Sequence, residues 1–164
     1  MKKLLLIILM LCFLTACTED KTLETVEDVY APQETQPMEL HLTLPKETTV
    51  QTLSSSAGEL YLCDGFTVAV QTFQGGDLNR TVKETTGYTL DRLTMLETEK
   101  DNIACYRLSW VSLGEGGDQA ARTMILDDGV YHYAVTVMAQ AEDAGALNDT
   151  WQEIFASVNL RTAP

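Results

Sequence analysis

The C-terminal part of the chain, from Gln119 to Leu160, constrains the fold more than any other stretch. Two strand-like runs, Gln119–Asp127 and Val130–Ala139, meet at the turn-forming residues Asp127-Asp128-Gly129. A link this short joins antiparallel neighbours, because parallel strands need a crossover of about a dozen residues or more. An amphipathic segment, Glu142–Val158, follows directly. The pattern predicts an antiparallel sheet with a helix packed on it.

The predicted C-terminal helix has one apolar side. Its large apolar side chains recur at helical spacing and form a single stripe, made of Leu147, Trp151, Ile154, Phe155 and Val158. Full burial of one large side chain is worth about 1.5–3 kcal/mol. Docking of this stripe on the sheet should therefore contribute strongly to stability, and the loss of Trp151 should have the largest effect.

Two further strand-like runs, Arg92–Thr98 and Ile103–Leu113, come before this unit. The links at 99–102 and 114–118 are short and polar. Sequential strands that are joined by short links usually pair as neighbours. The four runs from residue 92 to residue 139 therefore predict a four-stranded meander.

A hairpin and a short helix are predicted before the meander. The Asp64-Gly65 pair lies between two strand-like runs, 59–63 and 66–73, which is a strong signal for a two-residue hairpin turn. Asp77 is suited to cap the start of a helix, and Gly87 is suited to end it.

The folded part is predicted to begin near Met38. Leu40, Leu42 and Leu44 alternate with polar residues in a half-buried strand, and a second short strand is predicted over 48–53. The chain has 164 residues, which allows one domain with appendages. We therefore expect one α+β domain over 38–164, a curved antiparallel sheet packed by the C-terminal helix and the short helix.

The N-terminus has the features of an export signal. Lys2 and Lys3 precede an apolar run, 4–14, that is too short to span a bilayer, which needs about 20 residues. The residues Leu14-Thr15-Ala16-Cys17 resemble the lipobox of bacterial lipoproteins. The resemblance implies that residues 1–16 are cleaved off and that Cys17 is acylated, which anchors the protein to a membrane on its extracytoplasmic side. An ordinary cleaved signal with a chance cysteine is the alternative.

An acidic segment, 17–37, is predicted to be a flexible tether between the lipid and the domain, because it is too polar to bury a core. The whole chain has 24 acidic and 11 basic residues. Nucleic-acid binding needs a cluster of basic side chains on one surface. We therefore expect no nucleic-acid partner.

The order of elements resembles the Mog/PsbP-like fold, which includes the photosystem PsbP proteins and bacterial DcrB-type lipoproteins. The resemblance covers 38–160 and depends on the order of elements and on the closing helix, 151–158. It implies an accessory or binding protein rather than an enzyme, and it assigns no site residues. A cystatin-like curved sheet is the alternative architecture.

Few residues suggest chemistry. Cys63 and Cys105 are predicted either to form a disulfide, as in many exported proteins, or to be two small buried hydrophobic residues. The two histidines, His41 and His132, alternate onto the polar sides of their strands. No spacing in the sequence is typical of a zinc or calcium site. We expect no catalytic residues, no metal and no cofactor.

One face of the sheet is expected to stay uncovered and to bind a partner. Its predicted residues are Arg107, His132, Thr136 and Met138, beside Cys105 and Ser109. The predicted function is that of a non-catalytic accessory or binding subunit with a protein partner in the cell envelope. A solute-binding module or a small cell-surface hydrolase are the alternatives. An apolar cleft between helix and sheet would support the first alternative, and a pocket that holds His132 with acids would support the second.

Overall fold

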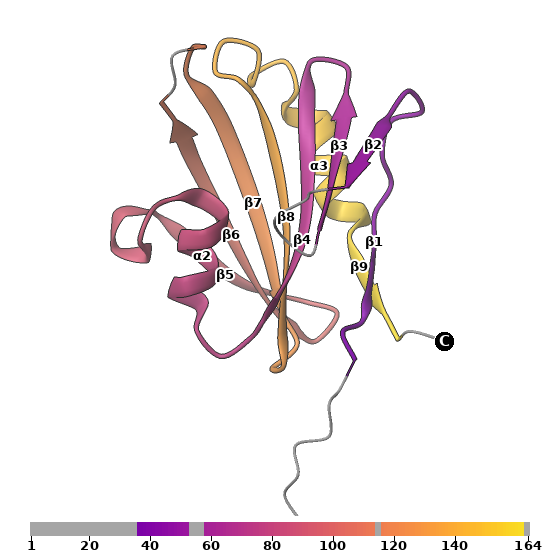
Figure 1. Ribbon diagram of the computed structural model, residues 1–164, viewed down its shortest axis with the longest axis vertical. Coiled ribbons are helices and arrows are strands. Elements are labelled where there is room, and N and C mark those ends of the chain that lie inside the picture. The colour runs from indigo at the N-terminus through magenta and orange to yellow at the C-terminus, as the bar shows by residue number, and fades with distance from the viewer. Residues whose placement is uncertain (1–35, 53–57, 114–115, 163–164) are drawn as a thin grey trace, which may run out of the picture. The chain divides into compact units, whose positions relative to one another are not determined.

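The computed structural model describes residues 36–52, 58–113 and 116–162. The predicted signal, Cys17 and the acidic tether lie outside these residues. The described part contains one large sheet, one small sheet and three helical segments (Figure 1). The elements are β1 (Glu39–His41), β2 (Thr49–Thr52), β3 (Gly58–Cys63), β4 (Phe66–Gln74), α2 (Leu78–Thr86), η2 (Leu90–Arg92), β5 (Met95–Lys100), β6 (Ile103–Ser112), β7 (Gln119–Asp127), β8 (Tyr131–Gln140), α3 (Asn148–Ser157) and β9 (Asn159–Arg161).

The large sheet is antiparallel, with the strand order β2-β3-β4-β8-β7-β6-β5. The predicted meander is confirmed, because β5, β6, β7 and β8 pair in sequence. The predicted hairpin of β3 and β4 is also confirmed. These two units join where β4 pairs with β8, so that Val68 lies opposite Val137. The predicted α+β fold class is therefore confirmed.

The sharp turns of the sheet use the residues that such turns require. Gly65 and Gly129 have positive φ, 77° and 89°, a region that glycine enters without a steric penalty. Asp128 accepts backbone hydrogen bonds from Val130, at 2.8 Å, and from Tyr131, at 2.6 Å. Asp127 accepts one from Gly129, at 2.8 Å. The carboxylates of this turn therefore satisfy backbone N–H groups.

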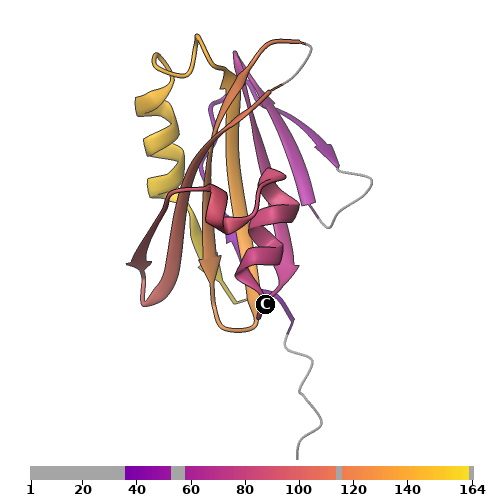
Figure 2. The ribbon, with the colours of Figure 1, turned by 90° about the vertical axis from the view of Figure 1, so that its left-hand side faces the viewer.

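Both faces of the large sheet are covered. Figures 1 and 2 show α3 on one side of the sheet and α2 with η2 on the other. On the α3 side, Trp151, Ile154 and Phe155 pack with the odd-numbered residues of β8, from Tyr133 to Ala139. On the α2 side, Val82 packs with residues that include Leu108, Trp110, Ile125 and Ala134. The expectation of an uncovered face was therefore wrong. The α2 helix carries too few apolar residues for its sequence to show that it covers a sheet.

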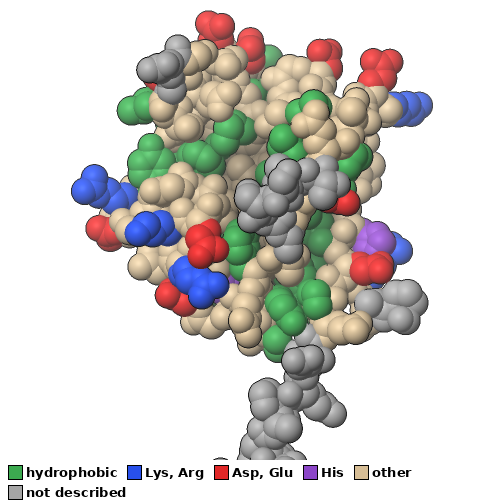
Figure 3. All heavy atoms as spheres, viewed as in Figure 1, with side chains coloured by type: hydrophobic (Ala, Val, Ile, Leu, Met, Phe, Trp, Pro, Cys, Tyr) green, Lys and Arg blue, Asp and Glu red, His purple; other side chains and the backbone are tan. Residues whose placement is uncertain are grey.

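The α2 helix has the predicted ends. Asp77 Oδ1 accepts a hydrogen bond from the Arg80 backbone N at 3.1 Å, and Gly87 closes the helix in the left-handed conformation, with φ of 80°. Figure 3 shows charged side chains gathered over this side of the molecule. The outer face of α2 is therefore solvated, while Val82 on its inner face is fully buried.

The C-terminal helix is shorter than the amphipathic pattern predicts. The segment 141–147 forms successive turns, and α3 begins at Asn148. Trp151 retains 1% of its exposure, and Val158, which follows the helix, is fully buried. The predicted apolar stripe therefore packs on the sheet as expected, although part of it comes from the turns before the helix.

A second sheet closes the domain. β1 pairs antiparallel with β9, so that Glu39 lies opposite Arg161 and Leu40 opposite Leu160. The sequence predicted a longer first strand, and it did not predict β9. Close by, the Met38 backbone N donates to the Tyr133 hydroxyl at 2.8 Å, and that hydroxyl donates to Asp128 Oδ2 at 2.8 Å. These bonds connect the start of the domain to the β7–β8 turn.

Two tyrosines should make the domain less stable at alkaline pH. Burial raises the pKa of Tyr61 to about 12, with a further rise from the hydrogen bond to Glu59. Burial also raises the pKa of Tyr133, and the bond to Asp128 adds to the rise. Above the ordinary tyrosine pKa of about 10, the unfolded chain loses protons that the folded chain keeps. The free energy of unfolding should therefore fall as the pH rises from 10 toward 12.

Urea unfolding at a series of pH values between 8 and 12 measures this effect. We expect the fall in stability to be shallower in Tyr133→Phe than in the natural chain. A fall in Tyr133→Phe and in Tyr61→Phe that is as steep as in the natural chain would contradict the assignment.

Candidate functional site

A groove lies between α3 and the floor that β6 and β7 provide, and its cavity volume is about 690 Å³. The helix covers the centre of the sheet and leaves this strip beside it open. The floor and wall combine apolar and polar side chains. The lining residues are Arg107, Leu108, Ser109, Arg122, Thr123, Met124, Gln152, Glu153, Phe155 and Ala156. We call this cavity the α3 groove.

Two arginines of the groove floor come from adjacent strands. Arg107 on β6 lies opposite Met124, and Arg122 on β7 lies opposite Ser109. The two arginines are therefore diagonal neighbours on the same face of the sheet, a relation that places residues roughly 7–8 Å apart. Neither arginine takes part in the ion pairs of the described residues. Their charges are therefore free to meet an anion.

Arg122 is held in place by two contacts with α3. Its Nη1 donates to Asn148 Oδ1 at 2.8 Å, and its Cζ lies 5.6 Å from the centre of the Trp151 ring. The second distance is within the range of a cation–π interaction. Arg122 is therefore positioned in advance, at the cost of little additional ordering when a ligand binds.

A smaller cavity, with a volume of about 340 Å³, shares Ser109 and Arg122 with the α3 groove. It is also lined by Gly145 and by Trp151. The indole Nε1 of Trp151 is buried, and it has no hydrogen-bond partner among the described residues. Buried donors are normally paired, and leaving one unpaired costs about 1–3 kcal/mol. The core beside the smaller cavity therefore contains an unpaired donor that is shielded from solvent.

A contact between β5 and α3 joins the edge of the sheet to the helix. The Lys100 Nζ donates to the backbone O of Ala156 at 3.2 Å. A cation at the C-terminal end of a helix is favourable, because the last carbonyl groups carry partial negative charge. This contact connects the edge strand to the end of the helical wall.

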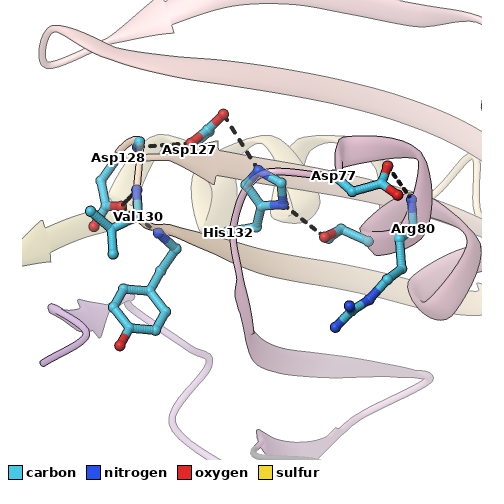
Figure 4. Close-up of polar contacts among 9 residues, drawn as sticks. Asp77, Arg80, Asp127, Asp128, Val130 and His132 are labelled. Atoms are coloured by element: carbon cyan, nitrogen blue, oxygen red, sulfur yellow. Dashed lines mark hydrogen bonds and ion pairs between the residues drawn. The ribbon is translucent and has the colours of Figure 1, made fainter. Parts of the chain in front are cut away.

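His132 belongs to a second polar cluster, on the α2 side of the sheet. Its Nδ1 lies 2.7 Å from Thr81 Oγ1, and its Nε2 lies 3.4 Å from Asp127 Oδ2. Figure 4 shows the His132 ring between the Asp127 turn and α2. A hydroxyl, an imidazole and a carboxylate in this order resemble a nucleophile relay. However, Thr81 and His132 are 2% and 1% exposed, so no substrate reaches the hydroxyl. The cluster fastens α2 to the sheet.

The four residues that the sequence predicted as a partner face do not share a face. Arg107 lies in the same row as Met124 and Val135, on the α3 side of the sheet. His132 and Thr136 are buried on the other side, and Met138 packs there against the α2 cluster. Only Arg107 therefore belongs to a groove. The prediction assigned β6 and β8 to a common face without knowing the register of the strand between them.

The two cysteines of the domain are free thiols. Cys105 is fully buried on β6, whereas Cys63 is partly buried on β3, with its Sγ 3.7 Å from Thr48 Oγ1. Three strands, β4, β8 and β7, separate β3 from β6. Neighbouring strands are about 4.8 Å apart, and a disulfide needs Cα atoms within about 7 Å. The positions of Cys63 and Cys105 therefore favour the interpretation that they are two small hydrophobic residues, rather than a disulfide.

The described part of the chain holds no group of three or more His, Cys, Asp or Glu side chains placed to bind a metal ion. Among the helices that the structure describes, none is both long and apolar enough to cross a bilayer.

Arg122 is a site residue that was not predicted from the sequence, although its position in β7 contains a signal. Arg122 alternates with Ala120, Met124 and Leu126 on β7, and this row faces α3. A charged residue in a row that is otherwise apolar is unusual in a covered sheet. Arg122 lies where the part of the sheet covered by α3 ends and the α3 groove begins.

The fold is that of the PsbP-like α+β proteins, as the sequence resemblance implied. No protein-family model matches the chain, and no curated protein matches it in sequence. Its fold is similar to that of cyanobacterial PsbP (CyanoP) from Synechocystis, with a TM-score of 0.57 and 8% identity. That match covers 76% of this chain and 93% of the cyanobacterial protein.

Two further solved structures are similar. LpqN of Mycobacterium tuberculosis, which is described as involved in cell envelope biogenesis, has a TM-score of 0.51 and 12% identity, over 79% of this chain and 87% of LpqN. A protein of Bacteroides thetaiotaomicron has a TM-score of 0.53 and 12% identity, over 75% of this chain. This chain spans only 45% of the Bacteroides protein. At these identities the similarity concerns the fold alone.

Proposed function

We propose that the protein is an extracytoplasmic lipoprotein, anchored to a membrane through acylated Cys17, that works as a non-catalytic accessory or binding subunit. The α3 groove is its binding surface. The observation that carries this proposal is a groove of about 690 Å³ beside a docked helix, with two arginines on its floor that no acidic side chain of the described residues pairs with. The role of LpqN in cell envelope biogenesis supports the same setting for this chain.

The composition of the groove favours binding over catalysis. Its polar groups include two guanidinium groups, the hydroxyl group of Ser109, and the carboxylate of Glu153. General acid–base chemistry usually needs an imidazole or a carboxyl group held within hydrogen-bond reach of a nucleophile. The one His–Asp pair that has a hydroxyl neighbour, His132 with Asp127, is closed on the opposite side of the sheet.

A solute-binding module is the second candidate function. Small-molecule sites in proteins typically have volumes of about 300–1,000 Å³, and the α3 groove falls within that range. The α3 groove also lies between helix and sheet, where a cleft was expected for a solute-binding module. In this case the bound small molecule, rather than an envelope protein, would be the natural partner.

Substitution of Cys17 tests the anchor. In Cys17→Ala, the sulfur that would carry the lipid is absent, so the protein should leave the membrane fraction almost completely and appear in the soluble or secreted fraction. Two acyl chains anchor a protein stably, because each buried methylene contributes about 0.8 kcal/mol. Immunoblots of membrane and soluble fractions measure the change. Cys63→Ala is the matched control and should remain on the membrane, whereas retention of Cys17→Ala there would contradict acylation at this residue.

Site-directed photocrosslinking in cells tests the binding surface. A benzophenone amino acid is placed at Gln152, which is exposed on the groove wall, or at Lys83, which is exposed on α2. A recurring envelope protein captured from Gln152 and not from Lys83 supports an accessory subunit. A small adduct at Gln152, without a protein, supports the solute-binding module. Equal capture from both positions would show that the groove is not the binding surface.

A further inference from the structure

The floor of the α3 groove carries positive charge, whereas the chain as a whole is acidic. The protein has 24 acidic and 11 basic residues, so its general field repels anions. Nevertheless, Arg107 and Arg122 lie together on the groove floor, outside the ion pairs of the described residues. Glu153 on the helical wall is the one carboxylate in the lining, and it pairs with neither arginine. Two guanidinium groups on adjacent strands are well suited to bind a single phosphate or carboxylate through charge-assisted hydrogen bonds.

The groove also offers an apolar surface beside these charges. Phe155 and the exposed Ala156 on the helix are among its lining residues, and Met124 lies below them with 1% exposure. Phe155 and Met124 belong to the core under α3, so an apolar ligand group placed there would extend that core. A ligand that fits has one anionic end and an apolar body.

Trp151 lies between the α3 groove and the smaller cavity beside it. Its buried Nε1 lacks an acceptor, and the Trp151 ring carries the Arg122 guanidinium on its face. Trp151 lines the smaller cavity that shares Ser109 and Arg122 with the α3 groove. A ligand oxygen at this junction would lie close to the donor-bearing side chains of Ser109 and Arg122.

The floor of the groove favours an amphiphile over an extended peptide. β6 and β7 are interior strands, and each pairs with neighbours on both sides. Their backbone N–H and C=O groups are therefore already used in the sheet. A peptide in the groove would have to leave its own backbone groups unpaired, which costs free energy, whereas a hydrocarbon chain has no such groups.

We infer that the α3 groove binds a lipid-like amphiphile, with its phosphate or carboxylate head on Arg107 and Arg122 and its hydrocarbon body along Phe155 and Ala156. This inference rests on the proposed function, of which it specifies the ligand. The free carboxylate of a fatty acid and the phosphate of a lipid head group present the same anionic chemistry to the two arginines.

Isothermal titration calorimetry tests the inference. The full chain, isolated from the cell that makes it, is held in nanodiscs of phosphatidylcholine, and empty nanodiscs provide the blank. Octyl phosphate, octanoate, octyl glucoside and inorganic phosphate are the probes. We expect saturable heat with octyl phosphate or octanoate, and which of the two binds more tightly distinguishes the phosphate source from the carboxylate source. Octyl glucoside and inorganic phosphate should bind at least about tenfold more weakly.

Variants locate the site. Arg107→Gln and Arg122→Gln should each weaken binding about tenfold, because each removes a charge-assisted hydrogen bond to the anionic head. Arg80→Gln, on α2 and paired with Glu84, is the matched control and should bind normally. Arg107 makes none of the contacts that fix Arg122, so its variant reports on binding even where Arg122→Gln is destabilised.

Several results would overturn the inference. They are the absence of saturable heat, equal binding of octyl glucoside, equal binding of inorganic phosphate, and unchanged affinity in Arg107→Gln. Displacement of the amphiphile by an acidic peptide at equal concentration would show that the groove selects peptides. Capture of an envelope protein at Gln152 without any amphiphile binding would overturn this inference and leave the proposed function standing.

Discussion

The Trp151→Ala variant should lose about 3–5 kcal/mol of unfolding free energy, because truncating a buried aromatic side chain removes its transfer free energy and leaves a cavity. Trp151 is 1% exposed and belongs to the core that joins α3 to the large sheet. The substitution also removes the ring on which Arg122 rests. Urea unfolding followed by circular dichroism measures the loss, and a domain of ordinary stability would keep only a small margin.

Gln152→Ala is the matched control for Trp151. The side chain is next in sequence and exposed, so its truncation should change the unfolding free energy by less than about 0.5 kcal/mol. A Trp151→Ala protein with the stability of Gln152→Ala would mean that α3 does not dock on the sheet. A large loss in both variants would indicate that the helix itself, rather than the packing of one side chain, is limiting.

The second large effect is expected on the opposite side of the sheet. His132→Ala should cost about 2–4 kcal/mol, because it opens a cavity under α2 and leaves the buried Thr81 hydroxyl without the acceptor or donor that lies 2.7 Å away. Hydrogen exchange should show the largest loss of protection in α2. Hydrogen exchange reports on the amides of α2 separately, whereas an unfolding signal averages over the whole domain.

Thr81→Val serves as the comparison for His132→Ala. It keeps the shape of the side chain and removes one hydroxyl, and it leaves one imidazole nitrogen unpaired. We expect a loss of about 1–3 kcal/mol, also concentrated in α2. If His132→Ala left the exchange of α2 unchanged, the cluster of Thr81, His132 and Asp127 would not be what holds the helix.

Much of the fold could be predicted because it is local. The period-two alternation of β6, β7 and β8, the Asp-Gly turn at 64–65 and the Asp77 and Gly87 ends of α2 all act within a few residues. The pairing of β4 with β8 and of β1 with β9 joins segments that are far apart in sequence. Such pairing depends on which edges remain free after the hairpins form, and no local pattern contains that information.

The candidate site could be predicted only in part, and the reason is register. Alternation shows which residues of one strand share a face, but a shift of one residue in a loop exchanges the faces of the next strand. The 114–118 link between β6 and β7 was therefore enough to separate Arg107 from His132. Polar residues misled the prediction as well. Thr136 is buried because its hydroxyl lies 2.9 Å from that of Thr123, which in turn accepts from Trp110 Nε1 at 3.0 Å.

The small β1–β9 sheet affects how the domain would respond to a force on its N-terminal end. Its three pairs begin with Glu39 opposite Arg161, so the first and last described segments of the domain end side by side. A force applied ahead of residue 36 would act first on the bond between the Met38 N and the Tyr133 hydroxyl, and then on the three pairs of this ladder. We therefore expect β1 to be the first strand to separate when force acts on the N-terminal end of the domain.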